Sequence, residues 1–210
     1  MSKLDMADAA RIIADCYAGQ DDAEVDTRID VAGVQATWRK DGVLVIPGTN
    51  ELADWFDFNL ALGGIHPIDG HGFDVVPGDS GALWHAGFLE HAQRVYMFAK
   101  AVRPKFILGH SLGAASAQIV GMSLAVPTIA FASPQVCRSR ERMMNEGWVV
   151  NVCRLDDGVC HVPPQFLGFR TIGSRYWLTP DAPDTDGTHS IDNYAALLKL
   201  KRIRERVPMQ

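Results

Sequence analysis

The chain has 210 residues, of which 47% are apolar and 21% are charged, and its formal net charge is −5. This length favours a single globular domain over residues 1–210 with a core of substantial size. The negative charge gives no indication of a nucleic-acid partner, and no apolar run approaches the ~20 residues of a membrane-spanning helix.

The N-terminal segment has the pattern of an amphipathic helix. Apolar residues recur at helical spacing between Met6 and Tyr17, Ser2 is placed to cap the helix, and Gly19 is placed to end it. This segment contains no apolar core of a signal peptide. We therefore expect a cytoplasmic protein, with release by a route that uses no signal peptide as the alternative.

Strand-like and helix-like runs alternate through the rest of the chain. The strand-like runs cover residues 31–38, 43–47, 106–109, 128–132 and 148–152. The helix-like runs cover residues 51–60, 82–101, 112–124 and 139–146. This alternation predicts an α/β fold with a mostly parallel central sheet and helices on both of its faces. Ligands of such sheets bind at the carboxyl ends of the strands, so the loops at Gly48, Ser111 and Asp156 are expected to meet at one edge.

Residues 61–82 show little regular periodicity and hold many glycines. A loop of this length in a compact domain is often a lid or a substrate-binding loop, and its place in the chain puts it over the same sheet edge. It contains no long amphipathic stripe, which argues against a large apolar flap. A surface loop without a role in binding is the alternative.

The most informative motif is Gly109-His-Ser-Leu-Gly113, which follows the apolar residues 106–108. The small residues after it are typical of a helix packed closely on a strand. The glycines permit a sharp turn, and the turn presents the Ser111 hydroxyl at a helix N-terminus, where developing negative charge is stabilised. We predict a nucleophilic serine, with an ordinary exposed serine in a glycine-rich turn as the alternative.

A nucleophilic serine needs a base, and His161 and His189 are the two histidines that follow Ser111 in the chain. His161 lies four residues after Asp157 in the same loop and is poorly placed to bridge that carboxylate and the serine. His189 directly precedes an apolar-periodic helix, from which its ring can reach the sheet edge. We predict His189 as the base, with a surface or helix-capping histidine as the alternative.

The acid that orients the base is expected after the strand-like run at 148–152. Asp156 and Asp157 both follow it, and because their side chains should point in different directions, only one is expected to face His189. We predict Asp157, with a turn aspartate that bonds its own backbone ahead of Gly158 as the alternative. The other candidates lie in a polar, turn-rich stretch and are expected to be solvated: Asp184, Asp186 and Asp192.

An oxyanion formed by attack of the serine needs two hydrogen-bond donors. Leu112, directly after the nucleophile, is expected to supply its backbone N–H. Thr49 follows an apolar run and a glycine turn, and it is expected to supply its N–H and its hydroxyl. No cofactor is expected, and the remaining histidines lack metal-ligand spacing: His66, His71 and His91.

Five ordered blocks between residues 40 and 195 resemble one known family. The blocks are Val45-Ile-Pro-Gly-Thr49 with Asp54-Trp55, Trp84-His-Ala-Gly-Phe88, Gly109-His-Ser-Leu-Gly113, Phe131-Ala-Ser-Pro-Gln-Val136 and Asp156-Asp-Gly-Val-Cys-His-Val-Pro-Pro164. Together with the late His189, they resemble the class 3 lipases, the fungal-type triacylglycerol lipases and their plant and bacterial relatives. The sequence departs from the family pattern at Pro47 and Gln135, where Arg is usual.

The resemblance implies an α/β-hydrolase fold and cleavage of carboxylic esters through an acyl-enzyme, with an ester or lipid as substrate. It aligns Asp157 with the catalytic aspartate of the family. Acyl transfer, phospholipase A1 activity or deacylation of a polymer by the same residues remain alternatives. A catalytically silent binding or structural module that kept the fold is a further one.

Two more expectations concern the cysteines and the C-terminal segment. The four cysteines lack metal-ligand spacing and are expected as reduced thiols, with a Cys153–Cys160 disulfide as the alternative. Residues 196–207 have a basic amphipathic pattern. We expect a helix packed on the domain, with transient contact with an anionic membrane or lipid surface as the alternative.

Overall fold

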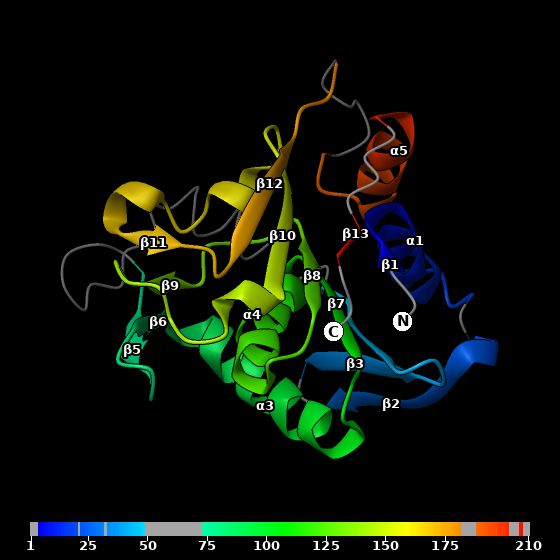
Figure 1. Ribbon diagram of the computed structural model, residues 1–210, viewed down its shortest axis with the longest axis horizontal. Coiled ribbons are helices and arrows are strands. Elements are labelled where there is room, and N and C mark those ends of the chain that lie inside the picture. Colours follow the sequence, from blue (N-terminus) through cyan, green and yellow to red (C-terminus); the bar gives the residue numbers. More distant parts are fainter. Residues whose placement is uncertain are drawn as a thin grey trace.

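The computed structural model describes residues 4–20, 22–31, 33–48, 73–181, 188–201 and 206–207. Its central sheet has seven strands: β2 (Val25–Val31), β3 (Val34–Arg39), β4 (Val43–Ile46), β7 (Phe106–His110), β8 (Thr128–Phe131), β10 (Val149–Arg154) and β12 (Ser174–Leu178). Their order is β12-β10-β8-β7-β4-β3-β2 (Figure 1). The strands from β12 to β4 run parallel, and β3 and β2 extend the sheet as antiparallel strands.

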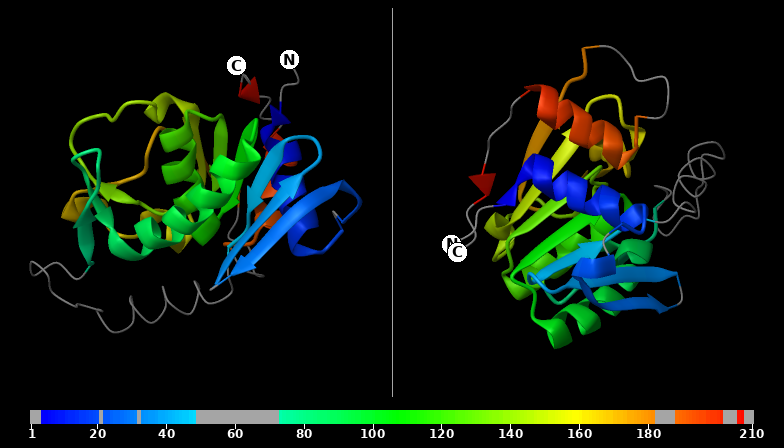
Figure 2. Two further views of the ribbon diagram at one scale, coloured as in Figure 1. Left: turned by 90° about the horizontal axis from the view of Figure 1, so that it is seen from below. Right: turned by 90° about the vertical axis from the view of Figure 1, so that its right-hand side faces the viewer.

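Helices cover both faces of this sheet. The helices α3 (Ala86–Val102) and α4 (Leu112–Leu124) pack together on one face. The helices α1 (Met6–Tyr17) and α5 (Ile191–Lys201) pack together on the other (Figure 2). The expectation of an α/β fold with a mostly parallel, doubly covered sheet is therefore confirmed.

The central strands are buried on both faces, which explains their continuous apolar sequences. Every residue of β4, β7 and β8 is buried. Successive side chains of β7 point to opposite faces. Ile107 joins the core beneath α3 and α4, while Phe106 and Leu108 join the core beneath α1 and α5. The sheet thus separates two apolar cores and holds the loops at its carboxyl edge in place.

Smaller elements complete the described fold. A four-stranded antiparallel sheet has the order β11-β9-β6-β5 and consists of β11 (Phe169–Arg170), β9 (Cys137–Arg138), β6 (Leu83–His85) and β5 (Val75–Pro77). The strands β1 (Leu4–Asp5) and β13 (Arg206–Val207) pair with each other, which places these two short segments from opposite parts of the chain side by side. The short 3₁₀ helices are η1 (Asp22–Glu24), η2 (Glu146–Trp148), η3 (Gly158–His161) and η4 (Gln165–Leu167).

Several predicted elements are confirmed. The helix predicted at 112–124 is α4 with the same bounds, and the strand-like runs at 43–47, 106–109, 128–132 and 148–152 correspond to β4, β7, β8 and β10. The N-terminal helix is also present. Its cap is Asp5, whose carboxylate accepts from the Ala7 N–H at 2.7 Å, whereas Ser2 lies outside the described residues. Gly19 has a φ of 65° just after the helix, as expected for a helix end.

One predicted element is displaced and another is wrong. The strand predicted at 31–38 is present as β3, but it begins only at Val34, because Gly33, with a φ of 77°, lies in the turn that follows β2. The helix predicted at 139–146 is absent. The Arg170 guanidinium donates to the backbone carbonyls of Ser139 and Glu141, so these groups are satisfied by a distant side chain instead of by helical hydrogen bonds.

Other boundaries differ from the prediction. The run at 82–101 begins as strand β6, and α3 starts only at Ala86, where the His85 ring accepts from the Phe88 N–H. The pattern at 196–207 is helical only as far as Lys201, and β13 follows. The predicted helix at 51–60 and most of the predicted loop at 61–82 lie outside the described residues. The described end of that loop contains β5, which pairs with β6.

Within the part of the chain that the structure describes, no helix combines the length and apolarity needed to cross a bilayer.

Candidate active site

Ser111 occupies a strained turn between β7 and α4. Its φ of 60° and ψ of −124° lie in a region that side chains with a Cβ rarely adopt. The flanking glycines make this turn possible. A Cβ on Gly113 would lie 1.9 Å from the Ile46 carbonyl oxygen, and one on Gly109 would lie 2.5 Å from the Gly113 oxygen. Only glycine at both positions lets α4 approach the strands closely enough to hold the serine at the sheet edge.

The structure brings Ser111, His189 and Asp157 together in one hydrogen-bonded chain. His189 directly precedes Ser190 and α5, and its Nε2 lies 2.8 Å from Ser111 Oγ. Its Nδ1 lies 3.0 and 3.1 Å from the two Asp157 carboxylate oxygens. Because an ionised carboxylate only accepts, Nδ1 carries the proton and Nε2 is left to accept the serine O–H. This arrangement prepares the serine for deprotonation.

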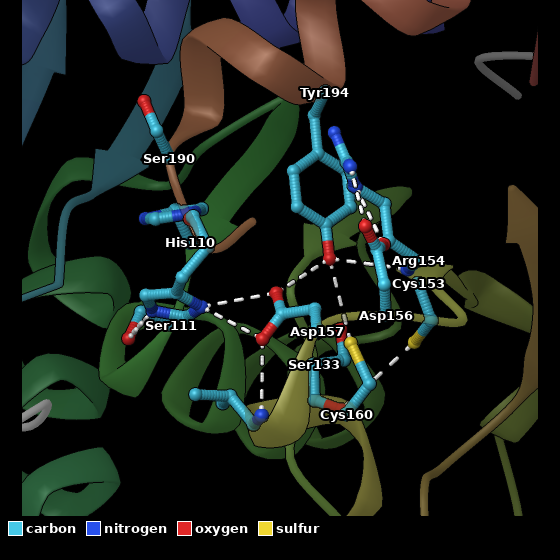
Figure 3. A network of polar contacts seen from close by, with 12 residues as sticks. His110, Ser111, Ser133, Cys153, Arg154, Asp156, Asp157, Cys160, Ser190 and Tyr194 are labelled. Atoms are coloured by element: carbon cyan, nitrogen blue, oxygen red, sulfur yellow. Dashed lines mark hydrogen bonds and ion pairs between the residues drawn. The ribbon is translucent and has the colours of Figure 1, made fainter. Parts of the chain in front are cut away.

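Asp157 is held as an ionised acceptor by several donors. It is buried at the start of η3, where its carboxylate accepts from the Val159 N–H at 3.0 Å and from the Tyr194 hydroxyl at 2.7 Å (Figure 3). Burial acts to raise the pKa of the Asp157 carboxyl, but the hydrogen bonds from His189, Tyr194 and Val159 outweigh it, and the pKa is lowered. The carboxylate therefore stays charged and faces the His189 ring.

Asp156 and His161, the alternatives to Asp157 and His189, have partners outside the Ser111–His189–Asp157 hydrogen-bonded series. Asp156 binds the buried Arg154 guanidinium through both carboxylate oxygens, at 3.0 and 2.8 Å, so it points in a different direction from Asp157. His161 Nε2 lies 3.0 Å from the Leu155 carbonyl oxygen. The His161 ring stacks on an exposed tryptophan of β12 and takes no part in the contacts of Ser111.

Tyr194 is a site residue that the sequence did not reveal. It is fully buried on α5, and its hydroxyl also accepts from the Arg154 backbone N–H at 3.1 Å and contacts Cys160 Sγ at 3.4 Å. Burial raises the pKa of Tyr194 well above its ordinary value, so the hydroxyl remains a donor to Asp157. In the sequence it is one apolar-stripe residue among others, and nothing local indicates its partner.

The thiols beneath this site are reduced. All four cysteines are free in the structure, including the predicted alternative pair Cys153 and Cys160. These two are buried next to each other below Asp157 and Tyr194 (Figure 3). Burial raises the pKa of the Cys160 thiol well above its usual value, so the thiol is protonated at neutral pH.

The predicted oxyanion donors are described in part. Leu112 is the first residue of α4, and the N–H groups of a first helical turn have no acceptor within the helix. Thr49 lies outside the described residues. Gly48, directly before it, packs against Ser111, because a Cβ on Gly48 would lie 2.7 Å from Ser111 Cβ. The segment after β4 therefore passes beside the serine as far as Gly48.

Among the described residues, no group of three or more His, Cys, Asp and Glu side chains is arranged to hold a metal ion. The polar contacts around Ser111 are those of a hydroxyl, an imidazole and a carboxylate in series. Such a series transfers a proton from the hydroxyl to the ring during nucleophilic attack.

The fold is similar to solved fungal lipases. Lipase II from Rhizopus niveus is 20% identical, with a TM-score of 0.59 over 93% of this chain and 94% of that one. The mono- and diacylglycerol lipase from Aspergillus oryzae is 17% identical, with a TM-score of 0.55 over 82% and 70%. A triacylglycerol lipase whose catalytic centre is formed by a serine protease triad is 20% identical, with a TM-score of 0.54 over 79% and 70%.

No family model matches the sequence, and a search of curated proteins finds no match either. At identities of 17–20% the structural likeness establishes the fold. The chain has the α/β-hydrolase fold that these fungal lipases share.

Proposed function

We propose that this protein is a serine hydrolase that cleaves carboxylic esters through an acyl-enzyme. The observation that carries the proposal is the unbroken chain from Ser111 Oγ through the His189 ring to the buried Asp157 carboxylate. The likeness to lipases in fold supports the class of reaction. Two of these lipases are named for triacylglycerols and for mono- and diacylglycerols, and we propose an ester of the same broad lipid-like class for this chain.

The reaction proceeds in two halves. His189 Nε2 removes the Ser111 proton as Oγ attacks the ester carbonyl, and the Leu112 N–H and the Thr49 loop hold the oxyanion. Asp157 stabilises the imidazolium that forms. The alcohol leaves with the proton from His189, which gives the acyl-enzyme. His189 then deprotonates a water that attacks the acyl carbonyl, and collapse of the second intermediate releases the acid and restores Ser111.

A chain-length series of p-nitrophenyl esters, with and without detergent micelles, tests the proposal. We expect hydrolysis by the parent protein and a loss of at least ~10³-fold in kcat for Ser111→Ala, because the nucleophile is removed. Ser123→Ala is the matched control, since its hydroxyl binds the Ile119 carbonyl within α4. Equal rates for the parent and Ser111→Ala would contradict the proposal, and added acyl acceptors in the same assay separate transfer from hydrolysis.

A further inference from the structure

A second hydrogen-bonded chain crosses the same edge of the sheet, and the mechanism above does not use it. The Tyr17 hydroxyl, at the end of α1, lies 2.6 Å from the Gly48 amide nitrogen and 2.9 Å from His110 Nδ1. His110 Nε2 lies 3.0 Å from the backbone carbonyl oxygen of His189. These contacts connect the loop that precedes Thr49 to the backbone that carries the His189 ring.

The direction of each hydrogen bond follows from the two ends of this chain. The Gly48 N–H only donates and the His189 carbonyl only accepts, so the Tyr17 oxygen accepts from Gly48 and His110 carries its proton on Nε2. A neutral imidazole with this proton accepts at Nδ1, which takes the Tyr17 O–H. Burial, helped by the nearby His189, lowers the pKa of His110 to about 3, so the ring stays neutral.

The Tyr17 hydroxyl also keeps its proton. Burial raises the pKa of Tyr17 to about 12, although the residue as a whole is exposed, because its hydroxyl lies between Gly48 and His110. Tyr17 and His110 meet edge to face with ring centroids 5.6 Å apart, and the His110 and His189 centroids are 5.0 Å apart. The three rings thus form a packed column beside the nucleophile turn.

Close packing leaves Gly48 little freedom. A Cβ on Gly48 would lie 3.0 Å from the Tyr17 hydroxyl and 3.0 Å from the His110 carbonyl oxygen. A shift of the Tyr17 hydroxyl therefore moves the Gly48 backbone, which packs against Ser111. Misplacement of a reacting group by about 1 Å can reduce a rate by ~10²-fold.

We propose that Tyr17 and His110 are positioning residues, which hold the Gly48 turn and the His189 backbone at a fixed separation so that the oxyanion donors and the base act on one carbonyl. This inference rests on the proposed ester hydrolysis. In this way α1, which is distant from Ser111 in sequence, becomes part of the active site.

Three single variants and one double variant test this role in the p-nitrophenyl ester assay. Tyr17→Phe removes the hydroxyl and keeps the ring, His110→Leu removes both hydrogen-bonding groups, and His110→Gln supplies one donor and one acceptor again. We expect kcat to fall about ten- to a hundredfold in the first two, with KM changed less than about twofold. We expect His110→Gln to recover part of the loss, and the double variant Tyr17→Phe/His110→Leu to lose no more than the worse single variant.

Tyr96→Phe is the matched control, because it removes a tyrosine hydroxyl from α3, at the hollow between α3 and α4. Thermal melts followed by circular dichroism report folding, and Tyr17→Phe keeps the test decisive if His110→Leu does not fold. A kcat within twofold of the parent in Tyr17→Phe would overturn the positioning role, as would losses that add in the double variant. If the parent itself shows no Ser111-dependent hydrolysis, the proposed function fails and this inference fails with it.

Discussion

Removal of the Tyr194 hydroxyl should weaken both the fold and the reaction. Tyr194→Phe deletes a hydrogen bond of 2.7 Å to the Asp157 carboxylate and one of 3.1 Å from the Arg154 N–H. A hydrogen bond to a charged group contributes about 1.5–3 kcal/mol, and a neutral one contributes about 0.5–1.5 kcal/mol. We therefore expect the free energy of unfolding to fall by about 2–4 kcal/mol at pH 7.5, measured by urea denaturation.

The pH dependence of this loss identifies its cause. The folded pKa of Asp157 is lowered, so the stability that its carboxylate contributes is present above the unfolded pKa of ~3.9 and is lost as the pH falls through the folded pKa. Tyr194→Phe raises the folded pKa. The loss in free energy of unfolding, relative to the parent, should therefore be complete between about pH 6 and 8 and should become smaller below about pH 4.

The same variant should lower kcat about tenfold with little change in KM, because a less firmly held carboxylate orients the His189 ring less well. Tyr96→Phe is the control and should stay within about 0.5 kcal/mol of the parent. Equal urea midpoints for Tyr194→Phe and the parent at pH 7.5, or a deficit that is the same at every pH, would refute this reasoning.

Three further changes have distinct expected outcomes. Gly113→Ala forces a Cβ into the carbonyl at the end of β4 and should lower the free energy of unfolding by more than ~4 kcal/mol in urea denaturation. Gly147→Ala is the control, because no atom lies within 4 Å of the new Cβ, and it should cost under about 1 kcal/mol. Equal urea midpoints for the two variants would contradict this prediction. Asp157→Asn should lower kcat by about 10³–10⁴-fold, while Asp156→Asn should chiefly lower the melting temperature, because a buried guanidinium loses its carboxylate. Burial lowers the pKa of His91 to about 4, so the unfolded chain binds a proton that the folded chain does not, and the free energy of unfolding should fall as the pH drops from about 6.5 toward 4. His91→Gln should make that fall shallower in a pH series of urea denaturations, and an unchanged slope would count against this explanation.

Local steric requirements explain which features the sequence could predict. The turn at Ser111 could be predicted because it needs two glycines at a fixed spacing, where a Cβ would collide with the backbone. The central strands could be predicted because burial on both faces requires continuous apolar residues. These two signals placed Ser111 and the loop of Asp156 and Asp157 at one edge of the sheet. His189 was predicted because it follows Ser111 in the chain and precedes an apolar-periodic helix, and the family resemblance aligned Asp157 with the catalytic aspartate.

The features that the sequence missed depend on partners far away in the chain. Tyr194 acts through Asp157, 37 residues earlier, and the contact depends on how α5 packs over the η3 loop. The segment at 139–146 has residues that favour a helix, yet Arg170 binds its carbonyls instead. The strand β12 exposes most of its side chains at the edge of the sheet, so it lacks the apolar pattern of its neighbours.

The central claim is that Ser111 is a nucleophile activated by His189. Incubation with a fluorophosphonate probe followed by peptide mapping tests it most directly, because the probe forms a covalent adduct with an activated serine. The account predicts one adduct, on Ser111, a labelling rate reduced at least ~10²-fold in His189→Ala, and an unchanged rate in His161→Ala, whose ring binds the Leu155 carbonyl instead. A folded parent protein that forms no adduct, or that is labelled equally fast with and without the His189 ring, would contradict it.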